Sequence, residues 1–266
     1  MSNPVFSSPA YSSATQVQHF PDQSTATPTG DPSTLQSMYN APSATPLDTN
    51  RMTYDDVIMK TAGLLVLLLA TGVVSWSLVD SVPGLWLGGL VVGLVLGLVN
   101  AFKRNPSPVL IALYAAAEGL FLGGISASFN VVYDGIVLQA VLATLATFTA
   151  SLLLFTSGAV RVTPKFNRFL LVAIAGYALF SLANLILVWT GVLDGWGMRG
   201  GQWGIIIGIV AVVLAAMSLI SDFDSIKRGV QAGAPRKFAW AAAFGLVVTL
   251  VWLYLEFLRL LAILRN

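Results

Sequence analysis

The sequence predicts an all-α protein of the membrane: a bundle of seven transmembrane helices behind a polar N-terminal tail. Hydrophobic residues occupy 56% of the 266 positions and charged residues only 10%. The mean hydropathy is +0.79. A soluble domain of this size carries about a quarter charged residues. The surplus apolar surface must therefore face lipid.

Seven apolar runs account for the helices. At a rise of about 1.5 Å per residue, each is long enough to cross a hydrocarbon core about 30 Å thick. The connections between them are short, so no sizeable domain lies outside the membrane. The runs cover residues 58–79, 85–102, 108–129, 136–157, 169–189, 203–222 and 239–264.

Residues 1–52 differ in composition from the rest. They are rich in Ser, Thr, Pro, Gln and Asn and poor in aliphatic residues. Such a segment buries too little apolar surface to offset its ordering entropy, which predicts a disordered tail. The transmembrane domain then spans residues 53–266, and Thr53-Tyr-Asp-Asp56 resembles the capping box that starts a helix.

The distribution of Lys and Arg predicts the orientation. Basic residues gather on the N-terminal side and in the loops after the second, fourth and sixth runs, whereas the opposite side carries only Arg199 and Arg265. By the positive-inside rule the N-terminus is cytoplasmic and the C-terminus outside. The residues on the predicted cytoplasmic side are Arg51, Lys60, Lys103, Arg104, Arg161, Lys165, Arg168, Lys227, Arg228, Arg236 and Lys237.

Composition also excludes several functions. The net charge of +2 and the lack of a basic stripe argue against nucleic-acid binding. Cysteine is absent, which removes disulfides and thiolate chemistry. The single histidine, His19, lies in the tail, so neither a membrane zinc protease nor a serine–histidine enzyme fits. We predict that the protein is not an enzyme and has no cofactor.

Small residues recur every four positions in two runs. Gly89, Gly93, Gly97 and Ala101 form one stripe, and Ala115, Gly119, Gly123 and Ala127 form the other. Such stripes let helix backbones approach closely in lipid. They indicate either packing between the second and third runs of one molecule, which we favour, or a dimer contact.

The chain has two glutamates, Glu118 and Glu256, and both lie inside apolar runs. A carboxylate in hydrocarbon costs several kcal/mol, so it usually faces a partner, water or an ion. Helical rise places both near the membrane midplane, where they would share a proton if the third and seventh runs are neighbours. Arg259 follows Glu256 by three residues and could instead neutralise it. A functional proton or cation site and a structural pair both remain open.

Asp222 and Asp224 close the sixth run, next to Lys227 and Arg228. They are either a solvated helix end or a carboxylate gate at the cytoplasmic mouth. Two acids spaced by two residues diverge on a helix, so at most one faces a pore. Oxygen ligands of this kind suit Ca²⁺.

The order of these segments resembles a known family. Phe223-Asp224-Ser225, then Gly229, then Leu253-Tyr-Leu-Glu-Phe-Leu-Arg-Leu-Leu261, is similar to the last two spans of the Bax inhibitor-1 (transmembrane Bax inhibitor motif) family. Tyr114-Ala-Ala-Ala-Glu-Gly-Leu120 is similar to its third span. The resemblance covers residues 53–266.

The resemblance implies a pH-sensitive Ca²⁺ leak channel in a bacterial plasma membrane. In that family an acid on span six and an acid on span seven share a proton and latch the pore, and a basic residue on span two can pair with them. Here the latch acids would be Asp222 or Asp224 with Glu256, and the basic partner Arg104 or Lys103. Glu118 and Arg259 are further candidates for this cluster.

Two other functions remain open. The resemblance also implies an interaction protein that modulates a membrane protease or a stress response, with function in the tail and basic loops. A proton-coupled transporter is less favoured, because the sequence shows no convincing inverted repeat.

Overall fold

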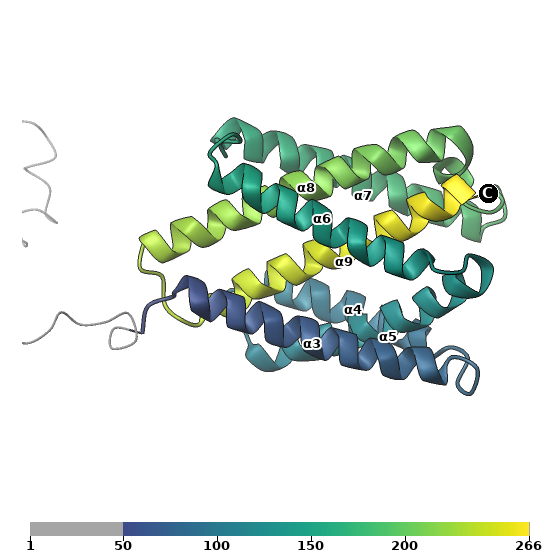
Figure 1. Ribbon diagram of the computed structural model, residues 1–266, viewed down its shortest axis with the longest axis horizontal. Coiled ribbons are helices and arrows are strands. Elements are labelled where there is room, and N and C mark those ends of the chain that lie inside the picture. The colour runs from purple at the N-terminus through teal and green to yellow at the C-terminus, as the bar shows by residue number, and fades with distance from the viewer. Residues whose placement is uncertain (1–49, 266) are drawn as a thin grey trace, which may run out of the picture. The chain divides into compact units, whose positions relative to one another are not determined.

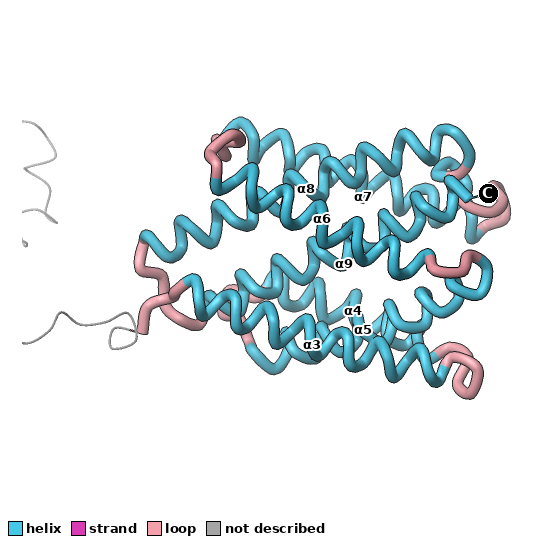
Figure 2. The backbone as a smooth tube through the Cα atoms, in the orientation of Figure 1, coloured by secondary structure: helices cyan, strands magenta, loops and turns pink. Residues whose placement is uncertain are grey.

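The computed structural model describes residues 50–265. The predicted polar tail, with His19, falls almost wholly outside this range and stays a prediction. Within the range the regular structure is helical, which confirms the all-α prediction (Figure 2). Seven helices are long and apolar enough to cross a membrane. They are α3 (Tyr54–Leu78), α4 (Leu85–Phe102), α5 (Pro108–Val132), α6 (Ile136–Thr156), α7 (Pro164–Trp189), α8 (Gly201–Gln231) and α9 (Phe238–Arg265), and a short 3-10 helix, η2 (Gly197–Arg199), precedes α8.

Two helices begin earlier than the apolar runs because threonines cap them. Thr53 accepts a hydrogen bond from the backbone N–H of Asp56, at 3.1 Å, and starts α3. Thr163 accepts from the N–H of Phe166 and starts α7. A hydroxyl in this position satisfies a donor that the first helical turn leaves free.

The largest difference from the predicted boundaries is the end of α8. The apolar run stops at 222, but the helix continues about nine residues further, to Gln231. Phe223 and Ile226 keep the helical spacing and are buried. Asp224 pairs with Arg228 one turn later, at 3.1 Å. The helix therefore persists as an amphipathic one, and the two aspartates lie inside it rather than at its end.

The last helix, α9, occupies the middle of the bundle. It packs against α3, α5, α6 and α8, and in Figure 1 it runs between the group of α3 to α5 and the group of α6 to α8. Its buried residues include Leu253 and Leu258. The figure also shows that α9 ends at the end of the bundle opposite to the start of α3. Polar residues on α9 are thus placed in the interior.

The small-residue stripes pack α5 against two helices. A Cβ added at Gly89 of α4 would lie 2.7 Å from the backbone nitrogen of Phe121 on α5. A Cβ at Gly123 of α5 would lie 2.1 Å from the carbonyl oxygen of Gly72 on α3. The first stripe therefore packs within one molecule, between α4 and α5, as favoured from the sequence. The second stripe faces α3 instead of α4.

The segment before α3 is joined to the connection between α8 and α9. The N–H of Met52 donates to the carbonyl of Ala234 and the N–H of Arg236 donates to the carbonyl of Asn50, both at 2.8 Å. Arg51 and Pro235 form an isolated antiparallel bridge. These contacts fix the start of α9 beside the start of α3.

We predict that Gly89→Ala destabilises the protein by about 1–3 kcal/mol, because its methyl group overlaps the α5 backbone. Thermal unfolding in detergent measures this. Gly88→Ala is the matched control, since a Cβ there meets nothing within 4 Å. Equal melting temperatures for the two variants would contradict close packing of α4 on α5.

Candidate functional site

A cluster of charged and aromatic side chains surrounds Glu256 on α9. Glu256 and Arg259 are 4% and 5% exposed, which makes them the most deeply buried charged residues that the structure describes. Arg259 lies on the same helix, Arg199 comes from η2, and Tyr177 comes from α7. The carboxylate therefore joins three segments that are distant in sequence.

Each oxygen of the carboxylate has a guanidinium partner. Arg259 donates from Nη2 to Oε2 at 2.6 Å and from Nε at 3.2 Å. Arg199 donates from Nη2 to Oε1 at 2.7 Å. The Tyr177 hydroxyl also donates to Oε1 and accepts from Arg199, whose guanidinium lies 5.4 Å from the centre of the tyrosine ring. Charge-assisted bonds of this kind are the strong ones in proteins.

The two arginines also tie the segment before α8 to α9. Arg259 Nη1 donates to the carbonyls of Arg199, at 3.2 Å, and of Gly204, at 3.4 Å. With one carboxylate and two guanidiniums, the ionised cluster has a net charge of +1. A positive cluster repels cations. This arrangement suits a structural clamp at the C-terminal end of α9 better than a cation-binding site.

Asp222 has a different environment. Its carboxylate accepts a hydrogen bond from the Thr249 hydroxyl of α9, from Oγ1 to Oδ2 at 2.8 Å. A Cβ added at Gly245, one turn earlier on α9, would lie 3.9 Å from the other oxygen. None of the ion pairs among residues 50–265 includes Asp222. Asp222 is therefore a carboxylate on the α8–α9 interface that has a hydroxyl partner and no basic one.

Asp224 diverges from Asp222, as their spacing indicates. It pairs with Arg228, whose side chain is 57% exposed. Of the two aspartates, Asp222 faces α9.

Asp222 and Glu256 do not meet. Thr249, the partner of Asp222, lies two turns before Glu256 on α9, or about 10 Å along the axis. The residue of α9 that contacts Asp222 is a threonine, and the groups bonded to Glu256 are Arg199, Arg259, Tyr177 and, weakly, Trp252. The structure thus keeps apart the two acids that the resemblance would place in one latch.

Glu118 lies on α5 and faces α4. A Cβ added at Gly93 of α4 would lie 3.0 Å from Oε1 of Glu118. The hydroxyl of Tyr114, one turn earlier on α5, forms a hydrogen bond with the Glu118 carboxyl group. Glu118 takes part in no ion pair within the described part of the chain. Glu118 and Glu256 therefore have separate partners. A hydrogen bond between α5 and α9 joins the hydroxyls of Ser126 and Tyr254, at 2.6 Å.

Lys103 and Arg104 are exposed in the loop between α4 and α5. No ion pair among the described residues joins either of them to Asp222, Asp224 or Glu256. The basic residues that contact Glu256 are Arg199 and Arg259.

Sequence reasoning missed three members of these contacts: Tyr177, Arg199 and Thr249. Arg199 was counted among the outer loop charges, and only a three-dimensional contact shows that it turns inward. Tyr177 carried a usable signal, because a tyrosine well inside an apolar run needs a partner for its hydroxyl. Within residues 50–265 no group of three or more acidic or histidine side chains is arranged to hold a metal ion.

We predict that Glu256→Gln lowers the free energy of unfolding by about 3–5 kcal/mol, because it leaves two guanidiniums without a compensating charge. Asp224→Asn is the control. The side chain of its partner Arg228 is 57% exposed, so the loss of this pair should cost less than about 1 kcal/mol. Unfolding in detergent measures both, and a Glu256→Gln variant as stable as Asp224→Asn would contradict the clamp.

A comparison with known families gives one match. The family described as Bax inhibitor 1 like matches residues 3–266. The match begins at residue 3, so it extends over the predicted tail, beyond the range covered by the resemblance drawn from motifs. A search of curated proteins finds no match. Because the match covers nearly its whole length, this membrane protein belongs to the Bax inhibitor 1 like family.

Proposed function

We propose that the protein is a pH-sensitive leak pathway for cations, Ca²⁺ among them, and that Asp222 is its protonation site. The observation that carries this proposal is the environment of Asp222: an acid within a membrane-spanning helix, with a threonine hydroxyl as its partner and no ion pair. An intramembrane acid that lacks a basic partner is stabilised by a proton or by a cation. Membership of the Bax inhibitor 1 like family supports the same function.

The position of Asp222 favours access from one end of the bundle. The helix continues about nine residues beyond it, so Asp222 lies roughly 14 Å from the end of α8. Glu118 lies at a similar depth, about ten residues into α5. These two intramembrane acids, which have no ion pair, therefore lie nearer to the end that carries most of the basic residues. Carboxylate, hydroxyl and carbonyl oxygens are the ligands that Ca²⁺ prefers, and Asp222, Thr249 and the Gly245 carbonyl supply one of each.

The Glu256 cluster would close this pathway at its other end. A cation that passes Asp222 along α9 approaches Arg199 and Arg259, whose combined charge exceeds that of Glu256. Because Arg199 belongs to the connection between α7 and α8, a shift of that connection would carry one positive charge away. We therefore assign Asp222 to proton sensing and the Glu256 cluster to closure. The single latch of two acids that the resemblance implies is thus replaced by two separate sites. One is the contact of Asp222 on α8 with Thr249 on α9, and the other is the cluster around Glu256 on α9.

We further propose a bacterial plasma membrane location with the Asn50 end of the described chain in the cytoplasm. All eleven basic residues that predict this orientation lie outside the helices or within their terminal two turns at the same end of the bundle, and Lys60 lies in the second turn of α3. The positive-inside rule then gives the direction.

We predict that Asp222→Asn abolishes the pH dependence of Ca²⁺ flux, because the amide cannot ionise. The measurement is Ca²⁺ entry into liposomes that hold the purified protein, at acidic and at neutral pH. Asp224→Asn, which alters an acid paired with Arg228 on the other side of the same helix, should behave as wild type. Thr249→Val should retain pH-dependent flux but with a shifted midpoint, since it removes a hydrogen bond from the carboxylate.

Two results would overturn this proposal. One is a pH profile for Asp222→Asn that equals that of the wild type. The other is no wild-type flux above that of empty liposomes, which would favour the interaction protein that modulates a membrane protease.

We predict that single cysteines report the orientation directly, because the chain has none of its own. In intact bacterial cells a membrane-impermeant maleimide should label Asp194→Cys in the connection between α7 and α8. It should label Lys103→Cys only after the cells are opened. The reverse pattern would overturn the proposed orientation.

A further inference from the structure

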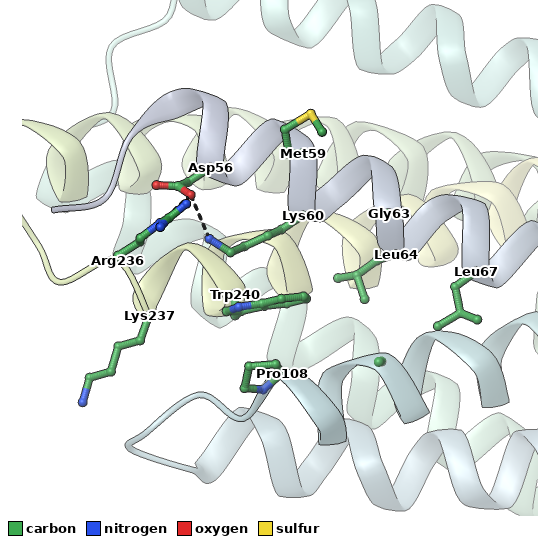
Figure 3. A pocket seen from close by; sticks show the side chains of 11 residues that line it. Asp56, Met59, Lys60, Gly63, Leu64, Leu67, Pro108, Arg236, Lys237 and Trp240 are labelled. Carbon is green, nitrogen blue, oxygen red and sulfur yellow. Dashed lines mark hydrogen bonds and ion pairs between the residues drawn. The ribbon is translucent and has the colours of Figure 1, made fainter. Parts of the chain in front are cut away.

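A groove opens between α3, α5 and α9 near the ends at which these helices begin (Figure 3). Its volume is about 650 Å³. It has an apolar part, formed by membrane-spanning segments, and a charged mouth. The lining residues that matter here are Lys60, Gly63, Leu64, Ala112, Lys237 and Trp240.

The apolar part is accessible from the lipid. Gly63 is exposed, and a Cβ added to it meets nothing within 4 Å. Leu64 and Leu67 of α3 and Ala112 of α5 line the same space. Further along, α3 and α5 come into close backbone contact at Gly72 and Gly123, so the groove is confined to this end. The open space at Gly63 can take a flexible hydrocarbon chain.

The mouth carries an excess of positive charge. Asp56 Oδ1 pairs with Arg236 Nε at 2.9 Å and with Lys60 Nζ at 3.2 Å. Figure 3 shows these two basic side chains turned toward Asp56, while Lys237 extends away from it. Lys237 donates to Asn105 at 2.9 Å. Three cations against one carboxylate leave a net charge of +2.

Asp56 and the backbone hold these cations in place. The Nε of Arg236 donates a hydrogen bond to Asp56, and the backbone N–H of Arg236 donates to the carbonyl of Asn50. The side chain of Arg236 is still 48% exposed, so its remaining N–H groups are available to a ligand. The ammonium of Lys60 lies 5.7 Å from the centre of the Trp240 ring. A tryptophan beside basic residues at a span end is typical of the headgroup level of a bilayer.

We propose that this groove binds an anionic phospholipid. Its phosphate would lie at Arg236, Lys237 and Lys60, and one acyl chain would run past Gly63 toward Leu67. Basic pockets between membrane helices on the cytoplasmic side are suited to anionic headgroups. A soluble phosphate would use the charged mouth but would leave the apolar part unfilled. The inference concerns lipid binding and does not depend on ion conduction.

The test is native mass spectrometry of the full-length protein in detergent with added lipid. Phosphatidylglycerol and phosphatidylcholine with identical acyl chains are compared, and glycerol phosphate serves as the probe without chains. Phosphatidylglycerol should bind best. Gly63→Phe, which fills the groove, should reduce its binding at least roughly tenfold, and Lys237→Gln should reduce it roughly fivefold, in line with the effect of one basic residue near a membrane surface.

Gly88→Phe is the matched control, because it places the same side chain in open space on α4. It should bind phosphatidylglycerol as the wild type does, and its melting temperature should match that of Gly63→Phe. The proposal is overturned if Gly63→Phe binds phosphatidylglycerol normally. It is also overturned if the two lipids bind equally, or if glycerol phosphate binds as well as the lipid.

Discussion

The ion cluster around Glu256 is the interaction on which the packing of α7, α8 and α9 depends. A carboxylate in the interior of a membrane protein requires partners, and here α9 provides one arginine while η2 provides the other. Arg259 also donates to the backbone carbonyls of Arg199 and Gly204, and Arg199 donates to the Tyr177 hydroxyl, so the cluster connects α7, the start of α8 and α9. Hydrophobic association is weak between helices in lipid, so such polar contacts determine which helices are neighbours.

Three acids of this protein that are buried or partly buried have different kinds of partner. Glu256 has two guanidiniums, Asp56 has a lysine and an arginine at the end of the bundle, and Asp222 has a threonine hydroxyl. The first two arrangements stabilise the ionised form with fixed positive charges. The third leaves the charge of the carboxylate without an ionised partner, which is the basis of the protonation role proposed for Asp222.

The sequence was sufficient for the helices and insufficient for their contacts. Hydropathy predicted all seven spans because lipid imposes a minimum apolar length on each. It misplaced the end of α8, since Phe223 and Ile226 extend the helix as an amphipathic one that an apolar count does not register. Depth along a helix is also linear in residue number, so the separation of Asp222 from Glu256 could be estimated. The rotation of each helix about its axis and the path of each loop could not be estimated from the sequence. The loop path brings Arg199 to Glu256, and the rotation of α8 and α9 turns Asp222 and Thr249 toward each other.

The hydrogen bonds between Asn50–Met52 and the residues before α9 have a mechanical consequence. The segment of residues 50–52 joins the bundle at the point where the central helix starts. A partner that pulls on that segment would act on α9 through a short and direct linkage, with no flexible loop between them. Since Thr249 and Glu256 both lie on α9, a small axial shift of this helix would change the contact of Asp222 and loosen the hold on Arg199 together. One helix, α9, thus connects the segment of residues 50–52 with the Glu256 cluster nearer the other end of the bundle.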